Sequence, residues 1–256
     1  MCVRVFAFST ILVIIFSCAT SADGFDAELR QLITDHGLQP IAQSPSSNTP
    51  LANLGKSLFF DRELSGNRNV SCATCHHPSA SSGDSRALPS GVGGVGLGPD
   101  RTQELDREVV PRNAPEIFHR GNSEWTNLFW DSRVAKENEK FKTPAGAQLP
   151  IGFEHVLQPQ AMFPVTSRAE MRGNDGDLDI NGQVNEIAQI ADGDFQGIWA
   201  ALTNRLMSIP AYKQAFQEAF PEVPEDKIGF QHAAKAIAEF EAASFSPNDS
   251  AWDRYL

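Results

Sequence analysis

The 256-residue chain has few basic residues and no cluster of them. Its 21 Lys and Arg residues stand against 32 Asp and Glu residues, which gives a formal net charge of −11. Because a nucleic-acid-binding surface needs a basic face to neutralise phosphates, this composition argues against such a partner. The hydrophobic fraction of 41% excludes a disordered or collagen-like chain. The acidic charge favours solubility or a basic protein partner.

The apolar run near the N-terminus is too short for a transmembrane helix, which needs about 20 apolar residues. It spans residues 5–16, follows a single basic residue, and precedes small residues that continue through Ala22. This order is typical of a signal peptide. The sequence therefore predicts that residues 1–22 are removed and that the protein is exported to the periplasm. Because residues 15–18 resemble a lipoprotein box, the alternative is a protein anchored by a lipid on Cys18.

Only two cysteines remain after this leader, Cys72 and Cys75. Two cysteines three positions apart make a poor structural disulfide, because the loop that they close is very short. A zinc site would need further Cys or His ligands at a suitable spacing, and a thioredoxin-like pair would need a βαβ context. His76 follows directly and completes the C-x-x-C-H signature of covalent haem attachment. The sequence thus predicts one haem c, bound by two thioethers and by the His76 imidazole on the proximal side of the iron.

Apolar residues recur at helical spacing along most of the chain, and no long stretch alternates with the period of a strand. The glycine-rich stretch 91–98 follows no predicted strand and opens no predicted helix, which argues against a nucleotide-binding loop. The sequence therefore predicts an all-α fold with long loops and one compact domain over residues 23–256. Helices are predicted around residues 26–36, 51–59, 198–206, 212–220 and 228–240.

Several sequence blocks resemble the first, peroxidatic haem domain of bacterial di-haem cytochrome c peroxidases and their MauG relatives. The blocks are residues 54–61, 71–76, 112–115, 129–133, 163–171 and 236–256. They follow one another in the family's order, and the match from the first block to the last, residues 54–256, covers about four fifths of the chain. The resemblance implies a cytochrome c-like helical haem domain that reduces hydrogen peroxide.

The resemblance also implies roles for three residues. Glu170 corresponds to the catalytic acid–base group, and a partly buried carboxyl with a raised pKa suits proton transfer to and from peroxide. Trp130 corresponds to the tryptophan that relays electrons between the two haems. Asn113 falls at the position of a calcium ligand, and its carbonyl oxygen is a suitable hard donor.

A second stretch has part of a calcium-loop pattern. Asp177, Asp179 and Asn181 place oxygen donors at alternate positions, and Gly182 follows at the turn. Ala188 stands where a calcium loop requires a bidentate glutamate. The sequence therefore favours a solvated acidic turn over a calcium site.

Two features depart from the family pattern. The second C-x-x-C-H motif, which in the family lies in a following haem domain, is absent. The sequence therefore predicts an N-terminal haem domain that is either a fragment or a stand-alone domain that needs an external electron donor. Residues 91–111, where many members carry a displaceable distal histidine, contain no histidine. The remaining candidates for a sixth ligand are His119, His155, Met162 and Met171. The sequence favours none of them and predicts five-coordinate iron, open to peroxide.

These observations predict a haem c peroxidase domain that takes electrons from a cytochrome or a small copper protein. One alternative is a MauG-like oxidase of a protein substrate. Another is a mono-haem electron-transfer cytochrome in which Met162 or Met171 caps the iron. A further alternative is a non-catalytic remnant or partner subunit.

Overall fold

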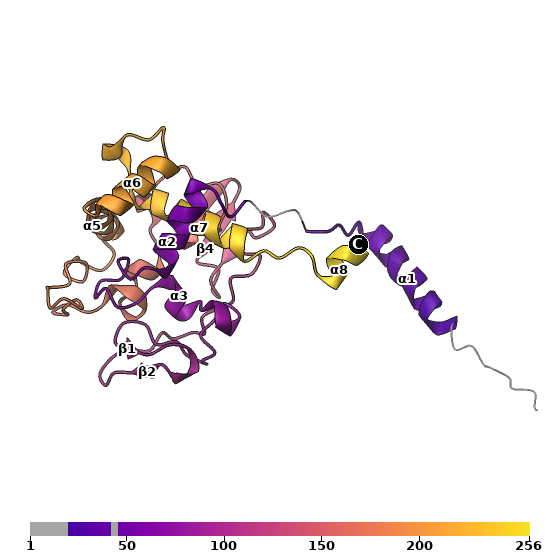
Figure 1. The fold of residues 1–256 in the computed structure, drawn as a ribbon, viewed down its shortest axis with the longest axis horizontal. Helices are drawn as coiled ribbons and strands as arrows, with labels where there is room; N and C mark the ends of the chain where they lie inside the picture. The colour runs from indigo at the N-terminus through magenta and orange to yellow at the C-terminus, as the bar shows by residue number, and fades with distance from the viewer. Residues whose placement is uncertain (1–19, 42–45) are drawn as a thin grey trace, which may run out of the picture. The chain divides into compact units, whose positions relative to one another are not determined.

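The computed structural model describes residues 20–41 and 46–256, which fall into two units, Met1–Ala42 with Asn248–Leu256 and Gln43–Pro247 (Figure 1). The smaller unit holds helix α1 (Thr20–His36) and helix α8 (Ala251–Tyr255). Within it, the Tyr255 hydroxyl donates to the Asp26 carboxylate at 2.5 Å. Except for its last three residues, the predicted leader lies outside the described part of the chain, and so does Cys18. Among the described helices, none combines the length and apolar character needed to cross a membrane.

The centre of the larger unit is the contact between helix α2 (Pro50–Phe60) and helix α7 (Phe230–Ser244) (Figure 1). At Gly55, a Cβ atom would lie 1.8 Å from the carbonyl oxygen of Ala236, so only glycine allows the two helices to approach so closely. The Thr49 hydroxyl caps α2 by accepting the N–H of Ala52 at 3.0 Å. The rings of Phe59 and Phe240 pack beside this contact, with centroids 5.3 Å apart.

Two further helices, α5 (Phe195–Met207) and α6 (Pro210–Ala219), complete the helical core. The apolar residues that predicted them are buried, including Leu202, Leu206 and Phe216. Helix α6 contacts both α2 and α5, so the four helices enclose one hydrophobic core. The structure confirms the predicted helical fold class.

The loops between these helices carry short elements that the apolar pattern did not predict. Strands of two to four residues are too short to show a period-two alternation, and so the sequence pattern did not reveal the two small sheets. Strand β1 (Gly94–Val95) pairs antiparallel with β2 (Thr102–Gln103), and a second antiparallel sheet has the order β3-β4-β5. The other short elements are β3 (Asn127–Leu128), β4 (Val134–Glu137), β5 (Lys140–Lys142), α3 (Cys72–Cys75), α4 (Leu157–Gln160), η1 (Pro78–Ala80), η2 (Gly98–Asp100), η3 (Gly146–Gln148), η4 (Pro164–Thr166), η5 (Arg168–Arg172) and η6 (Glu225–Lys227).

Candidate functional site

The C-x-x-C-H segment folds as the single helical turn α3 (Cys72–Cys75), which contacts α2. The Thr74 hydroxyl accepts the N–H of Ser71 at 3.0 Å and fixes the start of the turn. Both cysteines are unpaired and partly exposed. Burial raises the pKa of each thiol to about 12, so both are neutral. Two free thiols on one turn, not bonded to each other, suit covalent attachment to a single planar ligand.

The ring of His76 is oriented for ligation through Nε2. Its Nδ1 atom lies 3.1 Å from the carbonyl oxygen of Ser82, and because a carbonyl only accepts hydrogen bonds, Nδ1 carries the proton. Burial lowers the pKa of the imidazole and keeps it neutral. The Ser82 hydroxyl accepts the N–H of Ile117 at 2.9 Å and so ties this turn to the loop that follows. The Nε2 lone pair is therefore available to an iron atom.

Glu170 lies on a turn of π-helix, η5 (Arg168–Arg172), whose ends are anchored by arginines. Arg172 is 2% exposed, and both it and Arg168 donate to the Asp192 carboxylate, at 2.6 and 2.9 Å. The neighbouring carbonyl of Met171 accepts the N–H of Gly66 at 2.7 Å. Such π-turns are often found at functional sites, and here the turn fixes the backbone on both sides of Glu170.

The Glu170 side chain is half-buried, and its carboxyl has no hydrogen-bond partner among the described residues. Burial raises its pKa to about 7, and the Arg133 guanidinium opposes this rise. Its charge in turn contributes to the raised pKa of Cys75, which places the carboxyl within electrostatic reach of the attachment turn. The structure thus brings Glu170 toward the segment that the sequence predicted would hold the haem.

A second buried carboxyl, that of Glu241 on α7, was not found by sequence analysis. It is 7% exposed, has no hydrogen-bond partner among the described residues, and has a pKa that burial raises to about 8. Its charge contributes to the raised pKa of Cys72. The only sequence signal was a glutamate within an otherwise apolar helical stripe. Each cysteine of the attachment turn therefore has one unpartnered acid in its electrostatic surroundings.

Replacement of Glu241 by glutamine should stabilise the protein in alkaline solution. Since the pKa of this group is raised on folding, the folded state retains a proton that the unfolded chain releases, and stability falls as pH rises from about 4.3 through 8. We expect Glu241→Gln to gain at least about 2 kcal/mol at pH 9 and nothing at pH 4. Urea unfolding of the haem-loaded protein at both pH values checks this, with exposed Glu222→Gln as the control. Equal stability of Glu241→Gln and the unsubstituted protein at pH 9 would contradict the assignment.

Trp130 lies on the surface rather than against the attachment turn. It is 83% exposed, and the Arg112 guanidinium lies over its ring, 5.2 Å from the centroid. It belongs to the same turn as Arg133, whose charge acts on Glu170. Packing within this chain therefore does not explain why a tryptophan stands at this position.

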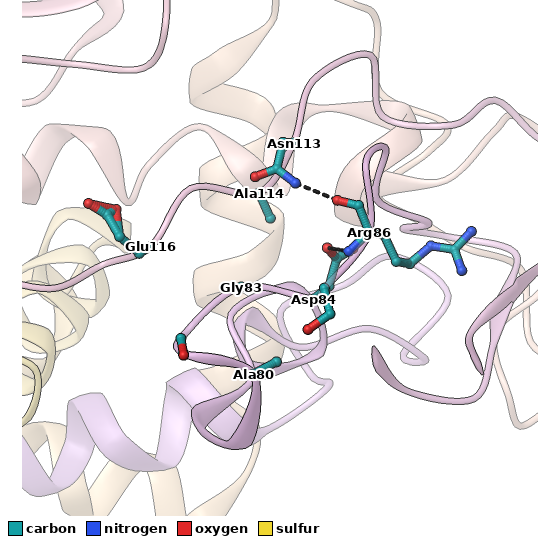
Figure 2. Close-up of a pocket in the computed structure, with 9 residues that line it drawn as sticks. Ala80, Gly83, Asp84, Arg86, Asn113, Ala114 and Glu116 are labelled. Carbon is teal, nitrogen blue, oxygen red and sulfur yellow. Dashed lines mark hydrogen bonds between the residues drawn. The ribbon is translucent and has the colours of Figure 1, made fainter. Parts of the chain in front are cut away.

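Asn113 lies in a shallow surface pocket, shown in Figure 2, rather than at the attachment turn. Its side-chain amide donates to the carbonyl of Arg86. Buried Asp84 lines the same pocket, and its Oδ2 atom has no hydrogen-bond partner among the described residues. Residues 20–41 and 46–256 contain no group of three or more His, Cys, Asp or Glu side chains that could hold a metal ion. Calcium at Asn113 stays a prediction.

The turn at residues 177–184 is exposed over most of its length, but its two acidic side chains are not free in solvent, which differs in part from the sequence-based interpretation. Asp177 accepts from Arg107 at 2.8 Å, and Asp179 accepts from Arg68 at 3.0 Å. Asp179 is buried. Both carboxylates are thus used in fixing loops to one another.

The four candidates for a sixth ligand occupy different surroundings. Met162 and Met171 are buried in the hydrophobic core. His119 and His155 are partly buried, and the Nδ1 atom of each has no hydrogen-bond partner among the described residues. Five-coordinate iron stays a prediction.

Another histidine, His232 on α7, has a structural role. It makes hydrogen bonds with Gly229 and packs against the ring of Phe220.

The attachment turn, the oriented imidazole and the two carboxyls without hydrogen-bond partners among the described residues, those of half-buried Glu170 and buried Glu241, fit a covalently bound haem. Cys72 and Cys75 would hold it by thioethers, and His76 would ligate its iron. Together with the helical core, these features define a c-type haem domain.

The family model for di-haem cytochrome c peroxidases matches residues 49–256, and the chain belongs to this family. It is 28% identical to the methylamine utilization protein MauG of Methylophilus methylotrophus, over 80% of this chain and 42% of that protein. It is also 28% identical to the cytochrome c551 peroxidase of Pseudomonas aeruginosa (88% of this chain, 45% of that protein) and to the cytochrome c peroxidase of Escherichia coli K12 (86% and 34%). The chain thus spans less than half the length of these relatives, which are oxidoreductases.

Proposed function

We propose that this chain is a haem c peroxidase domain that reduces hydrogen peroxide to water with electrons from an external redox protein. The overall reaction consumes one peroxide, two electrons and two protons and yields two water molecules. When bound, the haem supplies the iron that accepts peroxide and the electrons that cleave its O–O bond. The observation that carries the proposal is the half-buried carboxyl of Glu170, which lies on an anchored turn and has no hydrogen-bond partner among the described residues.

Glu170 meets the two requirements of a proton-transfer group. With a pKa of about 7, its carboxylate and its acid form are both populated at neutral pH, so it accepts a proton from one peroxide oxygen and returns it to the other. Since no group among the described residues bonds to the carboxyl, it is free to bond to substrate.

Trp130 is the proposed site of electron transfer with the donor. Its ring is 83% exposed, so a partner protein reaches it directly. A c-type cytochrome or a small copper protein fits this role, as does a second haem-bearing domain or subunit. Because the identities to MauG and to the peroxidases are equal, a MauG-like oxidation of a protein substrate through the same tryptophan is the second candidate function.

The proposed location follows from the sequence of the leader. Haem c is attached outside the cytoplasm, so we propose export to the periplasm, with a lipid anchor at Cys18 as the alternative.

A titration of the haem-loaded protein with hydrogen peroxide tests the proposed function. We expect a high-spin ferric spectrum that changes on addition of peroxide, and oxidation of two equivalents of a reduced cytochrome c or small copper protein per peroxide. A low-spin spectrum that peroxide leaves unchanged would contradict the proposal and would identify an electron-transfer cytochrome capped by methionine.

A further inference from the structure

The loop that contains strands β1 and β2 lies directly against the Glu170 backbone. The N–H of Val92 is 3.2 Å from the carbonyl oxygens of both Ala169 and Glu170. A Cβ atom at Gly91 would lie 2.1 Å from the Ala169 oxygen and 2.4 Å from the Glu170 oxygen. Backbone therefore packs on backbone at this point, with no room for a side chain.

The same loop is held from its other side by a single buried guanidinium, that of Arg101. This residue is 3% exposed. Its Nε, Nη1 and Nη2 atoms donate to the carbonyl oxygens of Ser90 at 2.6 Å, Gly96 at 2.7 Å and Gly91 at 2.7 Å. No carboxylate pairs with Arg101 among the described residues. A buried charge without an acidic partner is held here only by the backbone carbonyls that it gathers.

Gly91 takes part both in the contacts with Arg101 and in those with the Glu170 turn. Its carbonyl oxygen accepts a hydrogen bond from Arg101, and its Cα atom packs against the backbone of Ala169 and Glu170. A planar guanidinium with donors in fixed directions satisfies three carbonyls at once, whereas a lysine ammonium at the end of a flexible chain does not hold them in one arrangement. The guanidinium of Arg101 thus fixes the position of Gly91, and Gly91 packs against one side of the turn that carries Glu170.

We propose that Arg101 is a positioning residue for Glu170, which it holds in its enclosed place through the backbone of Gly91. The proposal rests on the proposed function, because it assigns a role toward the proton-transfer group of that reaction. It explains how a loop without histidine contributes to the site, since the loop encloses the acid instead of supplying a ligand.

The direction of the change in the pKa of Glu170 distinguishes this role from a direct effect of charge. If Arg101 acted through its charge, its removal would raise the pKa of the carboxyl. If it acts through the backbone, its removal loosens the loop, admits water to Glu170 and lowers the pKa. The charges that act on Glu170 include that of Arg133 but not that of Arg101, in agreement with the backbone route.

The test uses the full haem-loaded chain with the substitutions Arg101→Met, Arg101→Lys and Gly91→Ala. The pKa of Glu170 is followed by the infrared band of its protonated carboxyl, assigned with Glu170→Gln, and by the pH profile of the peroxide reaction. We expect all three variants to lower the pKa by about one unit or more and to slow the peroxide reaction about 10- to 100-fold. Arg101→Lys, which retains the charge, should resemble Arg101→Met.

Gly83→Ala is the matched control, because a Cβ there meets only ordinary contacts at 3.5 and 3.6 Å. It should leave the pKa and the rate unchanged. A raised or unchanged pKa in Arg101→Met and Arg101→Lys would overturn the proposal, as would a lowered pKa in Gly83→Ala. If Arg101→Met fails to fold, Gly91→Ala and Arg101→Lys decide. The infrared measurement needs no peroxide, so a failure of the proposed function is distinguishable from a failure of this inference.

Discussion

Glu170→Gln is expected to slow the reaction with hydrogen peroxide by about 10²- to 10⁴-fold at neutral pH, with the haem content unchanged. Glutamine has nearly the same shape as glutamate, but it neither accepts a proton from peroxide nor returns one. The effect should be large because Glu170 is the only carboxyl on the π-turn. Stopped-flow absorbance of the haem band after mixing with peroxide measures the rate constant.

The pH dependence of this reaction follows from the pKa of Glu170. Because the carboxylate form accepts the first proton, the rate constant should fall about tenfold per pH unit below 7 and level off above it. Glu170→Gln should show no such dependence. The exposed Glu222→Gln should retain both the rate and the profile. Full peroxide reactivity in Glu170→Gln would show that Glu170 is not the proton-transfer group.

The double substitution Cys72→Ala, Cys75→Ala should abolish covalent haem attachment. The two thiols lie on one helical turn, and the other two cysteines of the sequence, Cys2 and Cys18, lie in the predicted leader. The variant should also unfold more readily, because it would lose the covalent links and the packing of the haem against the attachment turn. Extraction with acidified acetone checks this, since covalent haem stays with the protein and free haem enters the solvent.

Single substitutions give the control for this result. Cys72→Ala and Cys75→Ala each leave one thiol, so each should retain haem through one thioether. Their haem absorption should shift relative to the unsubstituted protein, because one vinyl group stays unsaturated. Covalent haem in the double variant would show that attachment occurs elsewhere in the chain.

The sequence predicted those parts of the fold that depend on local spacing. The apolar residues of α2, α5 and α7 recur at helical intervals, and the attachment turn is a contiguous motif. The contact of α2 with α7 was not predictable in the same way. It depends on Gly55 meeting the backbone of Ala236, a contact between positions far apart in the chain. The short strands escaped prediction because two to four residues carry no periodicity.

The candidate site likewise contains residues that the sequence identified and residues that it did not. Glu170 was identified through its sequence block, but its burial depends on backbone contacts with Gly66 and Gly91 from two other loops. Glu241 and Arg101 were not identified at all. An acid in a largely apolar helix and an arginine in a polar loop have no distinguishing pattern, and only the fold shows that these two are buried.

Mass spectrometry of the peptide that contains Cys72 and Cys75, taken from the chain matured in a host that attaches haem c, tests the central claim most directly. The account predicts that this peptide carries the mass of one haem bound through both sulfur atoms. Recovery of the peptide with two unmodified thiols, or with the cysteines joined to each other, would contradict it.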